Sequence, residues 1–166
     1  MTRRQIALLV PILLTLHNVE EAMTFGPWLP LVQARAPVLL QLWINEVSLK
    51  GLPMALVVAT AVPWAVAVWA ASRPSYGIAI WSLLLVQAVV LVNVFWHLGA
   101  AVVLQGYAPG LLTAVMFNLP FSVYLFRRAV RDRWCSTHAL IGLVPAALVV
   151  HGPLLMGLVY LMGRIR

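Results

Sequence analysis

The stretch Leu16-His17-Asn18-Val19-Glu20-Glu21 places two adjacent carboxylates and an imidazole in an otherwise apolar N-terminal segment. The chain has only four acidic residues and four histidines, so this concentration is unusual. On a helix that turns about 100° per residue, His17, Glu20 and Glu21 lie on one face. A carboxylate inside a membrane costs several kcal/mol unless it is paired, neutralised or bound to a metal. The stretch therefore predicts a partner that compensates the two glutamates.

The composition is too apolar for a soluble domain of this size. Of the 166 residues, 63% are hydrophobic and 9% are charged, and the mean hydropathy is +0.98. This predicts an integral membrane protein with one transmembrane domain over residues 1–166. The formal charge of +7 comes from arginines that flank apolar segments, so we expect no nucleic-acid partner. The single cysteine, Cys135, excludes an internal disulfide and a thiolate-rich metal site.

Apolar runs separated by turn signals predict an all-α bundle of about five transmembrane helices. The first should end at Gly26-Pro27, and the last should kink at His151-Gly152-Pro153. Residues 28–50 are apolar but interrupted by prolines and charged residues, which favours an interfacial or re-entrant segment after the first helix. The five helices are expected over residues 4–24, 52–71, 76–104, 109–130 and 138–163.

The charges at the helix ends predict an orientation. The start, Met1-Thr2-Arg3-Arg4, imitates a signal peptide, but no small-x-small site follows and we expect no cleavage. The positive-inside rule favours a cytoplasmic N-terminus, in a bacterial-type inner or cytoplasmic membrane, because more basic residues then fall inside than outside. The inside residues are Arg3, Arg4, Arg73, Arg127, Arg128, Arg131 and Arg133, and the outside residues are Arg35, Lys50, Arg164 and Arg166.

Polar residues of several expected helices fall at one depth. A rise of about 1.5 Å per residue puts three of them near the midplane of the membrane and four more within about 10 Å of it. A bundle that turns these faces inward gathers five candidate metal ligands, with three polar residues behind them. The ligands are His17, Glu20, Glu21, His97 and His151, and the supporting residues are Asn93, Asn118 and Thr24.

Imidazole nitrogen and carboxylate oxygen suit a divalent metal, Zn²⁺ or Fe²⁺. The charge of the metal would offset the cost of burying Glu20 and Glu21. A single ion would leave one glutamate free to act as a general base on a bound water or substrate, whereas two ions could share both glutamates. We therefore expect Glu20 and Glu21 to be the catalytic residues.

The motif His17-Asn18-Val19-Glu20-Glu21 resembles the signature of the HxxEE-domain family of small multi-pass membrane proteins, which is largely uncharacterised. The later Asn93-Val94-Phe95-Trp96-His97, an Asn-x-x-x-His pattern, resembles a second feature of that family. The resemblance implies a multi-helix membrane fold and no particular reaction. It also implies a site formed by His17, Glu20, Glu21, Asn93 and His97, whereas His151 enters the predicted site through its depth alone.

A buried acid and imidazole cluster without a soluble domain predicts a membrane-embedded metalloenzyme, a hydrolase or an oxidoreductase. Its substrate would be lipid-soluble, such as a lipid, an isoprenoid or a sterol-like molecule, and membrane lipids or a second copy of the chain are further expected partners. A metal-free isomerase, in which a glutamate moves a proton, could use the same residues. Proton or divalent-cation transport is an alternative from another class, since midplane acids and histidines also line ion pathways. A further alternative is an accessory subunit whose polar layer docks a partner helix.

Overall fold

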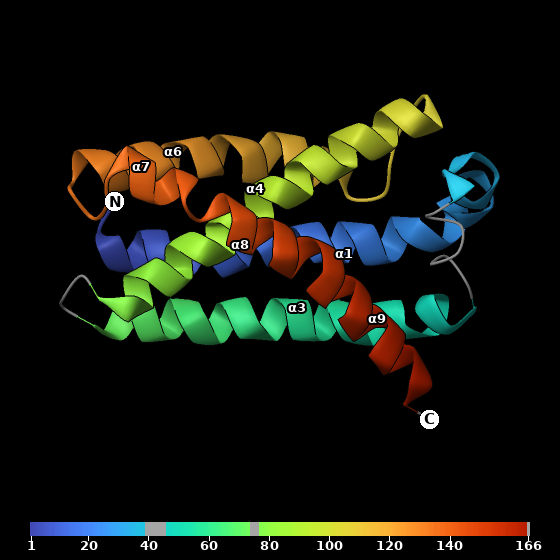
Figure 1. Ribbon diagram of the computed structural model, residues 1–166, viewed down its shortest axis with the longest axis horizontal. Coiled ribbons are helices and arrows are strands. Elements are labelled where there is room, and N and C mark those ends of the chain that lie inside the picture. Colours follow the sequence, from blue (N-terminus) through green and yellow to red (C-terminus); the bar gives the residue numbers. More distant parts are fainter. Residues whose placement is uncertain (39–45, 74–76, 166) are drawn as a thin grey trace.

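The computed structural model describes residues 1–38, 46–73 and 77–165, and every regular element in this part of the chain is a helix (Figure 1). Three long helices run side by side in alternating directions: α1 (Arg3–Arg35), α3 (Glu46–Ser72) and α4 (Ile78–Leu104). The predicted all-α bundle is therefore confirmed.

The second half of the chain forms two more interrupted helices. The first consists of α5 (Leu111–Thr113), the π-helix η1 (Ala114–Asn118) and α6 (Leu119–Arg131). The second crosses the bundle obliquely, and its last part packs against α3 (Figure 1). It consists of α7 (Thr137–Ile141), α8 (Val144–Val149), the π-helix η2 (Val150–Leu154) and α9 (Leu155–Arg164). The irregularity predicted at residues 151–153 is confirmed, since η2 contains Pro153.

Within the described residues, four helices are long and apolar enough to cross a membrane: Arg3–Arg35, Leu49–Ser72, Ile78–Leu104 and Thr137–Arg164. The helix predicted over residues 109–130 is present as α5, η1 and α6, but it is not one of these four. Asn118, Pro120 and the arginines at its end make it less apolar than its neighbours. The fold is that of a multi-pass membrane protein with four candidate spans.

The predicted end of the first helix at Gly26-Pro27 is wrong, because α1 continues to Arg35 with Pro27 and Pro30 inside it. Each proline removes one backbone donor, which a long helix in a membrane protein tolerates. Contacts with the end of α4 and the loop after it hold the extension: Trp28 lies 5.4 Å from Tyr107 between ring centroids, and Arg35 Nη1 donates to the Leu104 carbonyl at 2.5 Å. Of the predicted interfacial segment, residues 39–45 lie outside the described residues and residues 46–50 begin α3.

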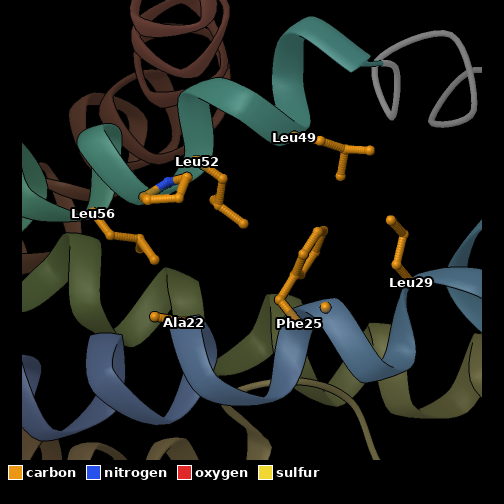
Figure 2. Close-up of a pocket in the computed structure, with 8 residues that line it drawn as sticks. Ala22, Phe25, Leu29, Leu49, Leu52 and Leu56 are labelled. Carbon is orange, nitrogen blue, oxygen red and sulfur yellow. The ribbon is translucent and has the colours of Figure 1, made fainter.

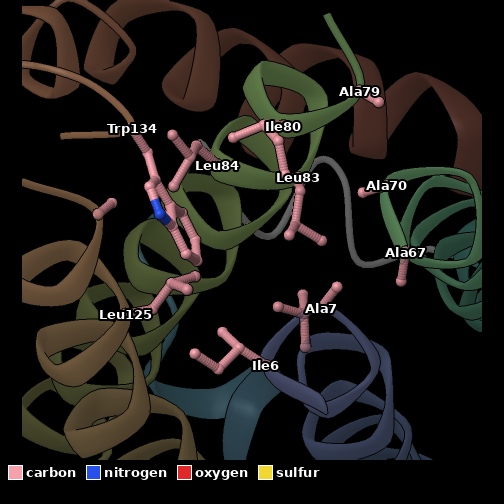
Figure 3. Close-up of a cluster of buried hydrophobic side chains, with 12 residues drawn as sticks. Ile6, Ala7, Ala67, Ala70, Ala79, Ile80, Leu83, Leu84, Leu125 and Trp134 are labelled. Carbon is pink, nitrogen blue, oxygen red and sulfur yellow. The ribbon is translucent and has the colours of Figure 1, made fainter. Parts of the chain in front are cut away.

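An apolar core at the end of the bundle that holds the N-terminus fixes α1 against α3, α4 and α6 (Figure 3). Large side chains fill it from three of the helices, and small residues of α3 face them, so the backbones can approach closely. The helix α1 begins there because the side chains of Thr2 and Gln5 satisfy its first backbone donors. The core includes Ile6, Ala7, Val10, Ala67, Ala70, Ile80, Leu83, Leu84, Leu125 and Trp134.

Two hydrogen bonds fix the rotation of α1 beside α3. Asn18 Nδ2 donates to Thr60 Oγ1 at 2.7 Å, and Trp64 Nε1 donates to Thr15 Oγ1 at 3.0 Å. These bonds turn Asn18 toward α3, and the preceding His17, about 100° away around the helix axis, faces α4 and α5, where it meets Asn93 and Thr113. The core and these bonds together aim the motif at the centre of the bundle.

Candidate metal centre

Three side chains with metal-ligating atoms meet between α1 and α4. His17 and Glu21 are one turn apart on α1, and His97 comes from α4. One ligand atom from each lies within 4.8 Å of the other two, and Nε2 of His17 is 3.7 Å from Oε2 of Glu21. His17 is fully buried and His97 is 4% exposed, while the Glu21 side chain remains 20% exposed. The arrangement is a buried imidazole pair with a carboxylate at its open side.

His97 has a buried polar atom that nothing in the described chain satisfies. Its Nε2 lacks a hydrogen-bond partner although the residue is enclosed. An unpartnered polar atom in an apolar interior costs about 1–3 kcal/mol, and such atoms are rare in folded proteins. The His97 ring stands edge-on to the His17 ring, with 4.7 Å between the centroids. A bound cation at this point would use the nitrogen that the protein leaves unsatisfied.

Gly110 closes one side of the metal centre, against the rings of His17 and His97. It has φ +80°, the left-handed conformation that favours glycine. A Cβ atom there would lie 2.8 Å from Cε1 of His17 and 2.9 Å from Cε1 of His97, closer than packed atoms allow. Backbone can approach both imidazoles only because this residue has no side chain. The turn thereby fixes both rings.

Glu20 points away from the three gathered ligands and meets the N-terminus of α5. Its Oε1 accepts from Tyr107 Oη at 2.5 Å and from the Leu112 N–H at 3.1 Å. Its Oε2 accepts from the Thr113 N–H at 2.7 Å and from the Thr113 hydroxyl. A carboxylate at a helix N-terminus satisfies donors that have no partner within the helix, and the helix dipole favours its charge. This explains how the N-terminal end of the segment formed by α5, η1 and α6 is capped.

The bonds of Thr113 also define the tautomer of His17. The Thr113 hydroxyl has one proton, which it donates to Glu20, so its oxygen accepts from Nδ1–H of His17 at 3.0 Å. The lone pair of His17 then lies on Nε2, which faces Glu21 and is 2.7 Å from Nδ2 of Asn93. A histidine that ligates a metal commonly donates its other ring N–H to an oriented acceptor. The side chains of Thr113 and Glu20 provide this orientation.

Tyr107 lies in the loop that follows α4, outside the spans, and completes the environment of Glu20. Its phenol is half-buried. Burial first, and then the hydrogen bond donated to Glu20, raise the pKa of Tyr107 above its ordinary value of 10.0. The phenol therefore keeps its proton at neutral pH and remains a donor to the carboxylate.

The other residues of the predicted site lie outside the gathered group. His151, in η2, stands edge-on to Trp96 with 6.2 Å between ring centroids. Thr24 Oγ1 donates to the backbone carbonyl of Glu20 at 2.7 Å. Asn118 is buried in a second polar cluster with Gln87 and Ser122, and its Nδ2 has no partner in the described chain. Asn93 does reach the centre, through Nε2 of His17.

Sequence reasoning did not identify Tyr107, Gly110 or Thr113 as site residues. A usable signal existed, because Pro109-Gly110 precedes a helix whose first backbone donors need an acceptor. The chain contains few acids, so Glu20 could have been considered as that acceptor.

The fold and the centre define a small multi-pass helical membrane protein with a buried histidine and glutamate cluster. The profile of a family described as a protein of unknown function with HXXEE motif matches residues 8–125, so the chain belongs to the HXXEE family. The matched range includes the motif, His97 and Thr113, and it excludes His151. The resemblance inferred from the motif is confirmed.

One similar protein is the uncharacterized protein YrkK of Bacillus subtilis (strain 168). It is 29% identical to this chain over 143 residues, which cover 82% of this chain and 85% of that protein. No solved structure matches the chain.

Proposed function

We propose that the protein is a membrane-embedded metalloenzyme that holds one divalent ion on His17, Glu21 and His97 and acts on a lipid-soluble substrate. The observation that carries the proposal is the buried Nε2 of His97, which has no partner among the described residues and lies beside the ligand atoms of His17 and Glu21. In tetrahedral or facial sites, metal bonds of about 2.0–2.2 Å hold ligand atoms roughly 3–3.6 Å apart. Small rotations of the three side chains would therefore bring their ligand atoms onto one ion.

The donor set indicates the class of metal. Two histidines and one glutamate form the ligand set of some catalytic zinc sites, and two histidines with one carboxylate form the site of many iron(II) oxygenases. Both leave coordination positions open to water or substrate. Zinc would support hydrolysis, and iron would support oxidation. We retain Zn²⁺ and Fe²⁺ as the two candidates.

The geometry favours one ion over two and changes the proposed role of Glu20. Both of its oxygens accept hydrogen bonds from the start of α5 and from Tyr107. A second ion on Glu20 would have to displace these donors. We therefore assign Glu20 to positioning His17 through Thr113, and Glu21 to the ion.

The side-chain amide of Asn93 competes with a bound ion for the lone pair on Nε2 of His17. Its Nδ2 lies 2.7 Å from Nε2 of His17, so a bound ion requires this amide to turn aside. The metal-free isomerase would instead keep this bond. Measuring bound metal therefore separates the two forms of the proposal.

An apolar groove supports a lipid-soluble substrate. It lies between α1 and α3, and its cavity of about 270 Å³ begins on α1 one residue after Glu21 (Figure 2). The lining residues are Ala22, Phe25, Gly26, Leu29, Leu49, Leu52, Pro53 and Leu56.

The test is metal analysis of the purified protein by mass spectrometry. We expect about one Zn or Fe ion per chain in the wild type. The His97→Ala variant should lose the ion, whereas the matched His138→Ala variant should keep it, because His138 is exposed on α7. His151→Ala should also keep it.

Two outcomes would contradict the proposal. Wild-type protein without bound metal, even after incubation with Zn²⁺ or Fe²⁺, would leave the metal-free isomerase as the remaining enzyme. Metal flux across proteoliposomes that stops in Glu21→Gln would instead favour transport.

A further inference from the structure

One face of α6 has a basic hollow that the metal centre does not use. Its volume is about 500 Å³, and its lining residues recur every three or four positions along one face of the helix. An apolar part comes first along α6, then a tyrosine, then three arginines. The lining residues are Pro120, Val123, Tyr124, Arg127, Arg128 and Arg131.

One carboxylate organises two of the three guanidinium groups. Asp132 accepts from Arg128 Nε at 2.5 Å with one oxygen and from Arg131 Nε at 3.0 Å with the other. Arg128 also donates from Nη1 to the Tyr124 hydroxyl at 3.3 Å. Three arginines and one aspartate give the group a net charge of +2. Asp132 thus holds the guanidinium groups of Arg128 and Arg131 near each other, and the group keeps an excess of positive charge.

The position of the hollow in the fold suggests what it would bind. The ends of α3 and α6 and the N-terminus lie at one end of the bundle (Figure 1). Arg3 of α1 donates to the Arg73 carbonyl after α3, which ties two of these ends together. Basic residues gathered at one end of a membrane bundle commonly face anionic headgroups. The hollow runs from apolar to basic toward this end.

We propose that the hollow binds the phosphate of an anionic phospholipid, such as phosphatidylglycerol, with an acyl chain along Pro120 and Val123. A guanidinium matches two oxygens of one phosphate, and arginine pairs provide charge-assisted hydrogen bonds. The net charge of +2 exceeds the single negative charge of a phosphodiester. An acidic peptide would leave the apolar half of the hollow uncovered, so a lipid fits the whole surface better.

The test is native mass spectrometry of the full chain released from detergent after titration with phosphatidylglycerol or phosphatidylcholine. Moderate salt is kept in the protein and lipid sample until the buffer exchange, because it screens nonspecific electrostatic attraction between lipid and protein. The variant Arg127→Gln/Arg131→Gln should bind phosphatidylglycerol about 100-fold more weakly than the wild type, since each of the two lost charged hydrogen bonds is worth about tenfold. Phosphatidylcholine binding should not change.

A matched variant separates a site from general electrostatics. Arg4→Gln/Arg133→Gln removes the same charge from the same end of the bundle without touching the hollow. It should keep phosphatidylglycerol affinity within about threefold of wild type. Equal losses in the two double variants would overturn the proposal. Displacement of the lipid by millimolar glycerol phosphate would also overturn it, because the hollow would then be a site for free phosphate.

Discussion

Thr113 contacts Glu20 with both its backbone and its side chain. The Thr113 N–H lies 2.7 Å from Oε2 of Glu20, and the hydroxyl donates to the same oxygen. That hydroxyl is also 3.0 Å from Nδ1 of His17. The first glutamate of the motif is therefore linked to the histidine through a residue 93 positions away, whereas the second glutamate lies beside the histidine directly.

We predict that Thr113→Val weakens zinc binding about 10- to 100-fold, a typical cost of losing the group that orients a ligating histidine. Valine keeps the branched shape of threonine and removes only the hydroxyl link. Thr113→Ser restores that link and should bind zinc like the wild type. Competition with a chromophoric chelator measures both affinities. Wild-type affinity in the valine variant would show that the link to Glu20 does not orient His17.

The two glutamates should differ in their effects on stability. In Glu20→Gln the amide NH₂ cannot accept the bonds that Leu112 and Thr113 donate, so we expect a loss of about 1–3 kcal/mol. Glu21→Gln should cost less than about 1 kcal/mol in metal-free protein, because its side chain is partly exposed and replacement relieves repulsion between adjacent carboxylates. Thermal unfolding in detergent with a chelator gives this comparison. A larger loss for Glu21→Gln would reverse the roles assigned here.

The Glu20→Gln and Glu21→Gln variants should show the opposite order in their effects on metal binding. Glu21→Gln removes a proposed ligand and should abolish binding of the ion, while Glu20→Gln should only weaken it. Mass spectrometry of the two variants beside the wild type measures bound metal. Loss of the ion in Glu20→Gln with retention in Glu21→Gln would move the site to the start of α5.

The sequence predicted that His17, Glu21 and His97 lie close together, because the helical period and the rise per residue decide their positions. The helical period places His17 and Glu21 on one face, and the rise per residue places His97 at a similar depth. The depth of a residue does not tell in which direction around the helix axis its side chain points. The depth argument therefore grouped His151 with the other candidate ligands. Its helix crosses the bundle obliquely, and the His151 ring meets Trp96 instead.

The helix start after Pro109-Gly110 indicated that an acceptor was needed, but an irregular loop determines that this acceptor is Glu20. The path from α4 to α5 depends on the left-handed backbone of Gly110 and on its approach to both imidazoles. Neither property has a period that a sequence pattern reveals. The predicted end of α1 was wrong for another reason. Proline usually ends a helix in water, whereas a helix in a membrane bundle tolerates prolines such as Pro27 and Pro30 inside it.

Gly110→Ala should disrupt the centre. The new Cβ would lie within 2.9 Å of both imidazoles at a backbone conformation that costs alanine about 1 kcal/mol or more. We expect lower thermal stability and loss of bound metal. Gly106→Ala, in the same loop, is the control, since a Cβ there meets nothing within 4 Å. Equal behaviour of the two variants would mean that the loop does not fix the histidines.

The basic hollow on α6 should bind lipid independently of pH over a wide range. Hydrogen bonds from Arg128, and then from Arg131, hold the pKa of Asp132 below its ordinary value of 3.8. The stabilisation from these pairs is therefore complete above that ordinary value and is lost only as the pH falls through the lowered one. Because a phosphodiester also stays ionised, phosphatidylglycerol affinity should be equal at pH 5 and pH 8. A change of more than about threefold between these values, measured with vesicles and wild-type protein, would show that a group other than Asp132 controls the hollow.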